Sequence, residues 1–373
     1  MKQIFNGIDT IDLANKILKG NRLGLLSTAS GVNKMGEPTY SILRDKFNLV
    51  ALYAPEHGIR SNLQEGKWND DCIDEETGLP LFNAGITDID KLDATLSCID
   101  MLVYDIQDVG ARFYTYLYNL SDMMQRCAVL KKPVIVLDRI NPIGGTFIEG
   151  PRLDENRFTS GVGKFNLPIR YGLTVGEYAK WLNSEKKIGC ELYVIPVQGW
   201  ERSLFINDTD LIFVNPSPNI PSVDTAINYI GTCLFEATNI SEGRGTTKPF
   251  DIIGAPFINS QALVSHLKSK KIEGLIPRRA TFTPMYGKHC GEVCEGVQLH
   301  ITDKNAYRPL YTALCILEHA REYKEFVVKD KEYLAKLYGT NDINLPLSPE
   351  SLISKTENEI IAYKKEIKPY LLY

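Results

Sequence analysis

The chain has 373 residues, of which 44% are hydrophobic, and it carries a formal net charge of −4 with a pI of about 5.9. This length allows a large core and predicts two or three domains. No Lys/Arg cluster stands out, which excludes the electrostatic footprint of a nucleic-acid-binding protein, and no apolar run approaches the roughly 18 residues of a membrane helix.

In chain order, short apolar runs that are typical of buried strands alternate with segments of helical periodicity. Thr174 and Glu177 form a capping-box pattern at the start of one such helix. The alternation predicts βαβ units, and hence an α/β fold with a mostly parallel sheet that helices cover on both faces. The expected strands are 22–30, 47–54, 98–108, 133–139 and 190–197, and the expected helices are 11–18, 113–132, 174–183 and 222–239.

The character of the chain changes after about residue 225, where strands and helices become more mixed. This pattern predicts a smaller α+β domain whose first loop, the Gly-rich segment 241–249, reaches back toward the sheet edge. We therefore divide the chain into an N-terminal domain, residues 1–226, and a C-terminal domain, residues 227–373. The elements expected in the second domain are helices 260–270 and 309–323 and strands 280–287 and 295–303.

The N-terminal segment and the cysteines bear on the compartment. Asp9, Asp12 and Lys16 interrupt the first apolar residues, so no signal-peptide core is present. The eight cysteines are scattered, several of them in apolar runs, which is typical of reduced thiols rather than of a disulfide frame. We expect a cytoplasmic protein with neither nucleic acid nor membrane as partner, and the sequence leaves the oligomeric state open.

Three of the expected strands end in ionisable or amide side chains. In open α/β sheets ligands bind beyond the carboxyl ends of the strands, and parallel strands bring these ends to one edge. A single polar site at this edge is the simplest interpretation. The residues are Glu56 and His57 after the second strand, Asp105, Gln107 and Asp108 after the third, and Asp138, Arg139 and Asn141 after the fourth.

Signatures of several enzyme classes are missing. The first strand is not followed by G-x-G-x-x-G, and the chain has no P-loop, no G-x-S-x-G and no H-E-x-x-H. What remains is acid/base chemistry by carboxylates, with no cofactor and no metal. A zinc site formed by His289, Cys290, Cys294 and His300 is the alternative, but its spacing is unusual and its ligands would crowd one hairpin.

Glu56 is the first candidate for the catalytic acid. It stands at a strand end before Gly58, where partial burial beside other acids would raise the pKa of a carboxyl. His57 would orient Glu56 or bind substrate. A simple turn cap is the alternative role of Glu56.

Two later stretches also combine polar and aromatic side chains. In 105–116, Tyr114 and Tyr116 suit the face of a sugar ring, although tyrosines at helical spacing are also typical of a core. A helix beginning near Arg112 would point its amide end at an anion. In the Gly-rich segment, Glu242 and Arg244 are flanked by glycines that keep a loop close to a ligand, and a solvated hinge is the alternative.

Eight motifs in order, "PEHGIR", "TGLPLF", "YDIQDVGARFYTY", "LDRINPIGG", "EGPRLD", "LPIRYGLTVGEYA", "NPSPNIPSVDTA" and "EATNISEGRGTTKPF", resemble the NamZ family of bacterial exo-β-N-acetylmuramidases over about residues 20–300. The resemblance implies a Rossmann-like N-terminal domain, a smaller C-terminal domain and an active cleft between them. It further implies release of N-acetylmuramic acid from the non-reducing end of peptidoglycan fragments, in cell-wall turnover or recycling. The catalytic glutamate of the family falls on Glu56, in agreement with its strand-end position. Many relatives carry an export signal, whereas none is recognised in this sequence. We therefore expect that the protein either acts on recycled fragments in the cytoplasm or has lost a leader.

The implied substrate carries a lactyl carboxylate, for which arginines are the natural partners. A second carboxyl group, Asp105, Asp108 or Glu242, would complete a two-carboxyl glycosidase, and attack by the substrate's own acetamido group or an eliminative cleavage stays open. A glycosidase for another acidic amino sugar stays open as well, as does a sugar-binding module without turnover. The catalytic candidates are thus Glu56, His57, Asp105 and Glu242, and the substrate-binding candidates are Arg60, Gln107, Asp108, Arg112, Tyr114, Tyr116, Asp138, Arg139, Asn141, Arg170, Asn219, Asn239 and Arg244.

Overall fold

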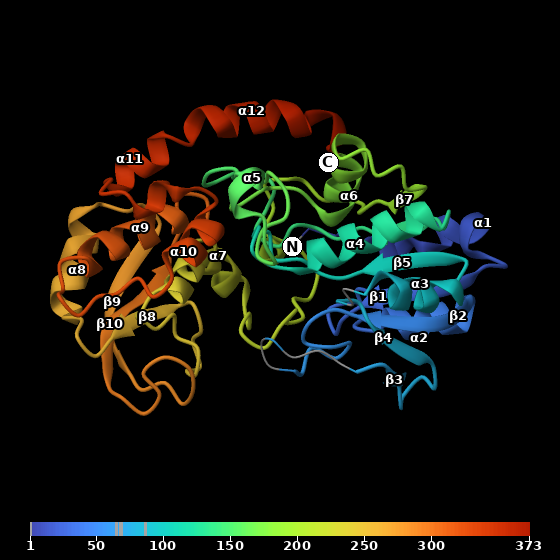
Figure 1. The fold of residues 1–373 in the computed structure, drawn as a ribbon, viewed down its shortest axis with the longest axis horizontal. Coiled ribbons are helices and arrows are strands. Elements are labelled where there is room, and N and C mark those ends of the chain that lie inside the picture. Colours follow the sequence, from blue (N-terminus) through green and yellow to red (C-terminus); the bar gives the residue numbers. More distant parts are fainter. Residues whose placement is uncertain (1, 64–65, 67–69, 86–87) are drawn as a thin grey trace.

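The computed structural model describes residues 2–63, 66, 70–85 and 88–373. Within this part, a larger domain is built on a seven-stranded sheet and a smaller one on a three-stranded sheet (Figure 1). The expected combination of a mostly parallel α/β domain with a smaller second domain is confirmed. The boundary between residues 226 and 227 stays a prediction, and it falls inside helix α7 (Val223–Thr232).

The large sheet has the strand order β3-β4-β2-β1-β5-β6-β7, and its pairs are parallel except β3 with β4. The five strands expected from apolar runs are all present, whereas the sequence does not predict the short edge strands β3 and β4. The strands are β1 (Arg22–Ser27), β2 (Asn48–Ala54), β3 (Cys72–Ile73), β4 (Pro80–Asn83), β5 (Met101–Asp105), β6 (Val134–Leu137) and β7 (Leu192–Ile195).

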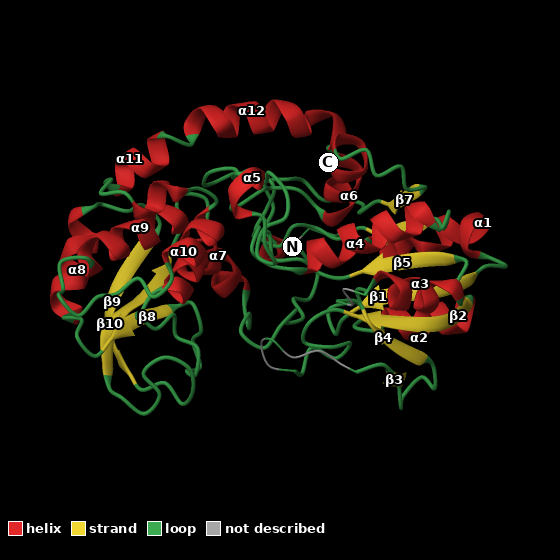
Figure 2. Cartoon of the chain, viewed as in Figure 1, coloured by secondary structure: helices red, strands yellow, loops and turns green. Residues whose placement is uncertain are grey.

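Helices cover both faces of this sheet (Figure 2). Side chains of β5 alternate between the two faces: Leu102 and Tyr104 pack toward α3, α4 and α6, while Met101 and Val103 pack toward α1 and α2. The expectation of a doubly covered sheet is therefore confirmed. The helices of this domain are α1 (Asn15–Leu18), α2 (Thr39–Lys46), α3 (Ile89–Ser97), α4 (Tyr116–Val129), α5 (Glu155–Phe158) and α6 (Val175–Glu185), with 3-10 turns η1 (Gly7–Ala14) and η2 (Ile206–Asp208).

Two local expectations about helix starts have different outcomes. The capping box is confirmed, because the Glu177 amide donates to Thr174 Oγ1 at 3.2 Å and the Thr174 amide donates to Glu177 Oε2 at 3.0 Å. The expectation that α4 begins near Arg112 is wrong, since it begins at Tyr116. The backbone before it is held in another conformation: the Arg112 amide donates to the carbonyl of Ile169 at 2.8 Å.

The small sheet is antiparallel, with the order β8-β10-β9. Helix α7 enters this domain from the larger one and packs against α9. Both expected helices and the strand expected at 295–303 are found, and β8 is an addition. The strand expected at 280–287 lies five residues earlier, at Leu275–Phe282. The elements are β8 (Ile252–Ala255), β9 (Leu275–Phe282), β10 (Cys294–Ile301), α8 (Ser260–Ser269), α9 (Pro309–Ala320) and α10 (Lys331–Tyr338), with 3-10 turns η3 (Cys233–Ala237) and η4 (Asn341–Asn344).

The C-terminal segment returns to the larger domain. Helices α11 (Pro349–Ser354) and α12 (Glu357–Ile367), followed by the turn η5 (Lys368–Tyr370), run from the smaller domain across to α6 and β7 (Figure 1). There the Tyr373 hydroxyl donates to Asp138 Oδ2 at 2.8 Å. The chain thus joins the two domains both at α7 and at its C-terminus. No helix in the described ranges has the length and apolarity to cross a membrane.

Candidate active site

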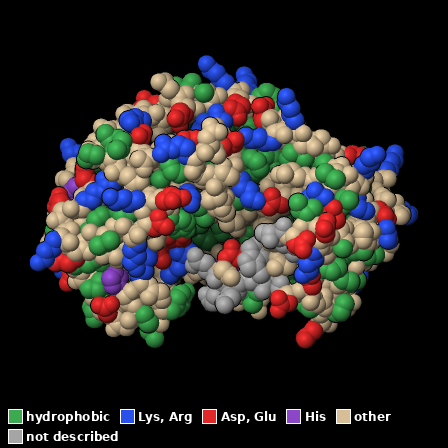
Figure 3. Space-filling view, viewed as in Figure 1, with side chains coloured by type: hydrophobic (Ala, Val, Ile, Leu, Met, Phe, Trp, Pro, Cys, Tyr) green, Lys and Arg blue, Asp and Glu red, His purple; other side chains and the backbone are tan. Residues whose placement is uncertain are grey.

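A cavity of about 270 Å³ lies between the two domains. Figure 3 shows the molecular surface hollowed between the two halves. The larger domain contributes the loop after β2, the residues that lead into α4 and part of the segment before α7, and the smaller one contributes α7, η3, the Gly-rich segment and α10. Six predicted residues line it: Glu56, His57, Tyr114, Tyr116, Asn219 and Arg244.

Glu56 and His57 reach the cavity on a tight loop directly after β2. His57 and Gly58 both have positive φ, at 71° and 78°, a conformation that a glycine adopts without cost and that costs His57 some strain. Glu56 Oε1 accepts from the amide of Gly66 at 2.6 Å. His57 Nδ1 lies 2.8 Å from the carbonyl oxygen of Leu63. Because a carbonyl only accepts, Nδ1 carries the proton, and Nε2 of the neutral ring is an acceptor.

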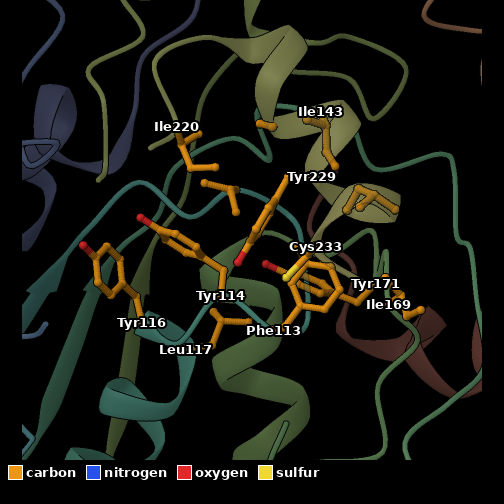
Figure 4. Packing of buried hydrophobic residues seen from close by; sticks show 14 of the residues in the cluster. Phe113, Tyr114, Tyr116, Leu117, Ile143, Ile169, Tyr171, Ile220, Tyr229 and Cys233 are labelled. Atoms are coloured by element: carbon orange, nitrogen blue, oxygen red, sulfur yellow. The ribbon is translucent and has the colours of Figure 1, made fainter. Parts of the chain in front are cut away.

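Aromatic rings from both domains line the cavity, and Figure 4 shows how Phe113, Tyr114, Tyr116 and Tyr229 pack together. Tyr114 and Tyr116 meet edge to face with ring centroids 4.7 Å apart, and Phe113 meets Tyr229 in the same way at 4.9 Å. Tyr229 in turn packs on Phe250 at 4.6 Å. All five rings belong to the hydrophobic core, as tyrosines at helical spacing often do, and Tyr114 and Tyr229, each 7% exposed, are the most accessible of them.

Tyr116 also ties the loop after β2 to the segment before α7. Its hydroxyl donates to the carbonyl of Pro216 at 2.8 Å and lies 3.3 Å from the carbonyl of Glu56. Thr115 and Tyr116, which begin α4, both line the cavity. The amide end of α4 therefore opens on the cavity, where its dipole favours an anion.

The smaller domain also brings a charged cluster to the cavity. Arg244 Nη1 donates to Glu236 Oε1 at 2.7 Å, and the guanidinium lies over the Phe250 ring at 4.8 Å. The Tyr333 hydroxyl donates to Glu236 Oε2 at 2.9 Å. Arg244, Glu236 and Tyr333 all line the cavity. The Gly-rich segment, which was expected to reach back toward the sheet edge, thus brings Arg244 to the cavity that Glu56 and His57 also line.

Glu242 takes part in this cluster without lining the cavity. It accepts from Arg244 Nη1 at 3.2 Å and from Lys288 Nζ at 2.8 Å. Burial alone would raise the pKa of Glu242, but the charges of Lys288 and Arg244 outweigh it and leave that pKa below its usual value. This environment suits an ion-pair anchor better than a proton donor.

The structure corrects the expectation that all three strand ends open into one site. Asp105, at the end of β5, forms a buried ion pair with Arg139, which follows β6, with Oδ1 and Nε 2.5 Å apart. Arg139 also donates to the carbonyl of Val32 at 2.7 Å, and the Thr39 hydroxyl donates to Asp105. Because β5 and β6 are neighbours, the Asp105 carboxylate and the Arg139 guanidinium meet at the sheet edge. The two charges neutralise each other there instead of facing a ligand.

Four other strand-end residues are also buried and form hydrogen bonds in the interior. Gln107 Nε2 donates to two backbone carbonyls, and Asn141 Nδ2 donates to the carbonyl of Leu173. Burial raises the pKa of Asp108 to about 7, although Tyr171 and the Gly110 amide donate to it. Burial likewise raises the pKa of Asp138 to about 7, against donors that include Gly176, Thr174 and Tyr373. None of the four lines the cavity.

The remaining predicted binding residues also lie outside it. Arg112 is fully buried and donates to three backbone carbonyls, and Arg170 pairs with Glu149 at 2.9 Å. Arg60 lies at the surface, paired with Asp74 and Glu76. Asn239 bonds the backbone of Glu325 and Val327. Of the five arginines considered for the lactyl carboxylate, Arg244 alone lines the cavity.

The alternative zinc site does not assemble in the described part of the chain. His289 Nε2 bonds the carbonyl of Asn239 at 2.6 Å, and Cys290 Sγ donates to the carbonyl of Met285. Among the described residues, no group of three or more His, Cys, Asp or Glu side chains is placed to hold a metal ion.

Several lining residues escape the sequence analysis. Glu236 and Tyr229 lie in the segment 222–239, whose amphipathic pattern predicts a packed helix, and Tyr333 lies in a tail without any motif. Three of them could have been found because they lie in two of the eight motifs. Glu236 is the first residue of "EATNISEGRGTTKPF", and Ser217 and Ile220 lie within "NPSPNIPSVDTA". The missed lining residues are Gly66, Phe113, Thr115, Val162, Ser217, Ile220, Tyr229, Glu236, Phe250 and Tyr333.

Comparison with known proteins gives a consistent result over the whole chain. Residues 23–224 match the family model described as exo-β-N-acetylmuramidase NamZ, N-terminal, and residues 227–373 match its C-terminal counterpart. The peptidoglycan β-N-acetylmuramidase NamZ of Bacillus subtilis (strain 168) is 39% identical over 383 residues, covering 100% of this chain and 92% of that protein.

Two solved structures of DUF1343 family proteins from Bacteroides fragilis NCTC 9343 share the fold. The first is 30% identical with a TM-score of 0.91 and covers 100% of both chains. The second is 29% identical with a TM-score of 0.78, covering 100% of this chain and 99% of the other.

Proposed function

Because the chain belongs to the NamZ family of exo-β-N-acetylmuramidases, we propose that it hydrolyses peptidoglycan fragments and releases N-acetylmuramic acid from their non-reducing end. The observation that carries this proposal is the position of Glu56, which opens from the end of β2 into a cavity between the two domains. Ligand pockets commonly measure roughly 300–1,000 Å³. A cavity of about 270 Å³ fits one amino sugar, as removal of a terminal residue requires.

Glu56 supplies the proton that the leaving oxygen needs. As the bond between the anomeric carbon and the glycosidic oxygen breaks, the bonding pair stays on that oxygen, which takes the Glu56 proton. A water molecule then adds its oxygen to the anomeric carbon and returns a proton to the Glu56 carboxylate. His57, whose Nε2 is an acceptor, binds a sugar hydroxyl beside it.

Arg244 and the amide end of α4 supply the preference for muramic acid. N-acetylmuramic acid differs from N-acetylglucosamine by its lactyl ether, whose carboxylate calls for a cation or for backbone amides. Arg244 is the arginine that the described structure brings to the cavity, and Thr115 and Tyr116 bring the start of α4. Tyr114 and Tyr229, which meet edge to face in the cavity, then pack on the sugar ring. This chemistry fits cell-wall turnover or recycling.

The test compares two chromogenic substrates that differ in the lactyl group. We expect the protein to release nitrophenol from the β-N-acetylmuraminide and to spare the β-N-acetylglucosaminide. Arg244→Lys keeps the charge but loses the planar fork, so kcat/KM should fall for the muraminide. Equal rates on both substrates would remove the claim of specificity for muramic acid.

A further inference from the structure

Two acidic residues are found among the described residues that line the cavity: Glu56 from the larger domain and Glu236 from η3 of the smaller one. We propose that Glu236 is the second catalytic carboxylate, a fixed negative charge that stabilises the positive charge developing at the anomeric carbon. This inference rests on the proposed function, since it assigns the missing charge of that reaction. It replaces Asp105, Asp108 and Glu242 in this role, none of which lines the cavity.

The contacts of Glu236 fit a fixed charge. Oε1 accepts from Arg244 Nη1 at 2.7 Å and Oε2 accepts from the Tyr333 hydroxyl at 2.9 Å. With both oxygens bound, the carboxylate keeps its orientation and has little freedom to attack carbon. Its side chain is 12% exposed, so solvent screens its field poorly.

The donors to Glu236 are themselves held in place. Arg244 is fixed by Glu242, at 3.2 Å from Nη1, and by the ring of Phe250. Tyr333 comes from α10, distant in sequence, and acts as a positioning residue. Such preorganisation is what makes a charge effective in the transition state, because no reorganisation is needed when the substrate charge develops.

The step balances without a further reactant. The bond between the anomeric carbon and the leaving oxygen breaks, its electron pair goes to the oxygen, and the oxygen takes the Glu56 proton. The cationic sugar faces the Glu236 carboxylate until water adds to the carbon and returns a proton to Glu56. Glu236 gains and loses no bond in this sequence.

The decisive variant is Glu236→Gln, which keeps the shape of the side chain and removes its charge. We expect kcat/KM to fall about 10²–10³-fold, equally for a nitrophenyl muraminide and for a disaccharide, because the charge acts on the sugar and not on the leaving group. Glu242→Gln is the matched control: it removes a second partner of Arg244 but no cavity charge, so its loss should be smaller. Tyr333→Phe should lower kcat about 5–10-fold and leave KM unchanged.

The outcomes separate this inference from the proposed function. A wild-type protein that releases no muramic acid would overturn the proposed function itself. An active wild type together with a fully active Glu236→Gln, or with a Glu242→Gln that loses as much, overturns only the role of Glu236. If Glu236→Gln does not fold, Glu236→Asp replaces it and should retain more activity than Glu236→Ala. Formation of a glycosyl azide by Glu236→Ala in azide would overturn the electrostatic role in favour of a nucleophile.

Discussion

Asp108 gives the folded protein a pH dependence whose size follows from its environment. The carboxyl is fully buried beside Tyr171, and burial raises its pKa from 3.8 to about 7. In the unfolded chain Asp108 is ionised above about pH 4, whereas in the folded chain it stays protonated up to about pH 7. Between these values the folded state binds more protons, so the contribution of Asp108 to stability falls as the pH rises through this window.

Asp108→Asn removes that dependence while keeping an oxygen that accepts from Tyr171 and from the Gly110 amide. One pKa unit corresponds to about 1.4 kcal/mol, so the two units between pH 5 and pH 7 correspond to about 3 kcal/mol. The variant should therefore gain about 3 kcal/mol in unfolding free energy relative to the wild type on going from pH 5 to pH 8.

The assay is urea unfolding of both proteins at pH 5 and pH 8. Asp100→Asn is the control, because Arg22 holds the pKa of Asp100 at about 2, and its contribution is constant over this range. A difference in unfolding free energy between Asp108→Asn and the wild type that stays the same from pH 5 to pH 8 would show that burial does not keep Asp108 protonated.

Two further predictions concern the domain contact and metals. Arg112 donates to the carbonyls of Pro151, Leu167 and Leu337, at 2.8, 2.7 and 2.8 Å, and so connects the two domains. Arg112→Lys should therefore cost about 2–4 kcal/mol in urea unfolding, against less than about 1 kcal/mol for the exposed Arg22→Lys; equal costs would contradict this role. Dialysis against a chelator should leave muramidase activity intact, and a loss that a divalent ion restores would contradict a mechanism by carboxylates alone.

The main strands were predictable because they are apolar on both faces. β1, β2, β5, β6 and β7 each lie between two helical layers and read as continuous apolar runs. The edge strand β3 escaped prediction because it has two residues, Cys72 and Ile73, both exposed.

The site was predictable only in part, for a physical reason. Glu56 stands at a strand end followed by Gly58, and that signal is local. Whether charges at neighbouring strand ends face a ligand or each other depends on strand order, which the sequence does not reveal, and so Asp105 and Arg139 were misplaced. Glu236 was hidden in an apolar stretch, and its partner Tyr333 meets it only through the packing of η3 against α10.

The proposed reaction depends above all on Glu56 as the general acid, and Glu56→Gln removes this proton donor while keeping the shape of the side chain. The turnover of the variant is measured on a disaccharide with N-acetylmuramic acid at its non-reducing end and on the nitrophenyl muraminide, with folding checked by circular dichroism. Loss of a general acid lowers turnover of the disaccharide by about 10²–10⁴-fold and that of the nitrophenyl substrate by less, since nitrophenolate leaves without a proton. Disaccharide turnover near the wild-type rate would contradict the account and reduce the loop after β2 to a structural turn.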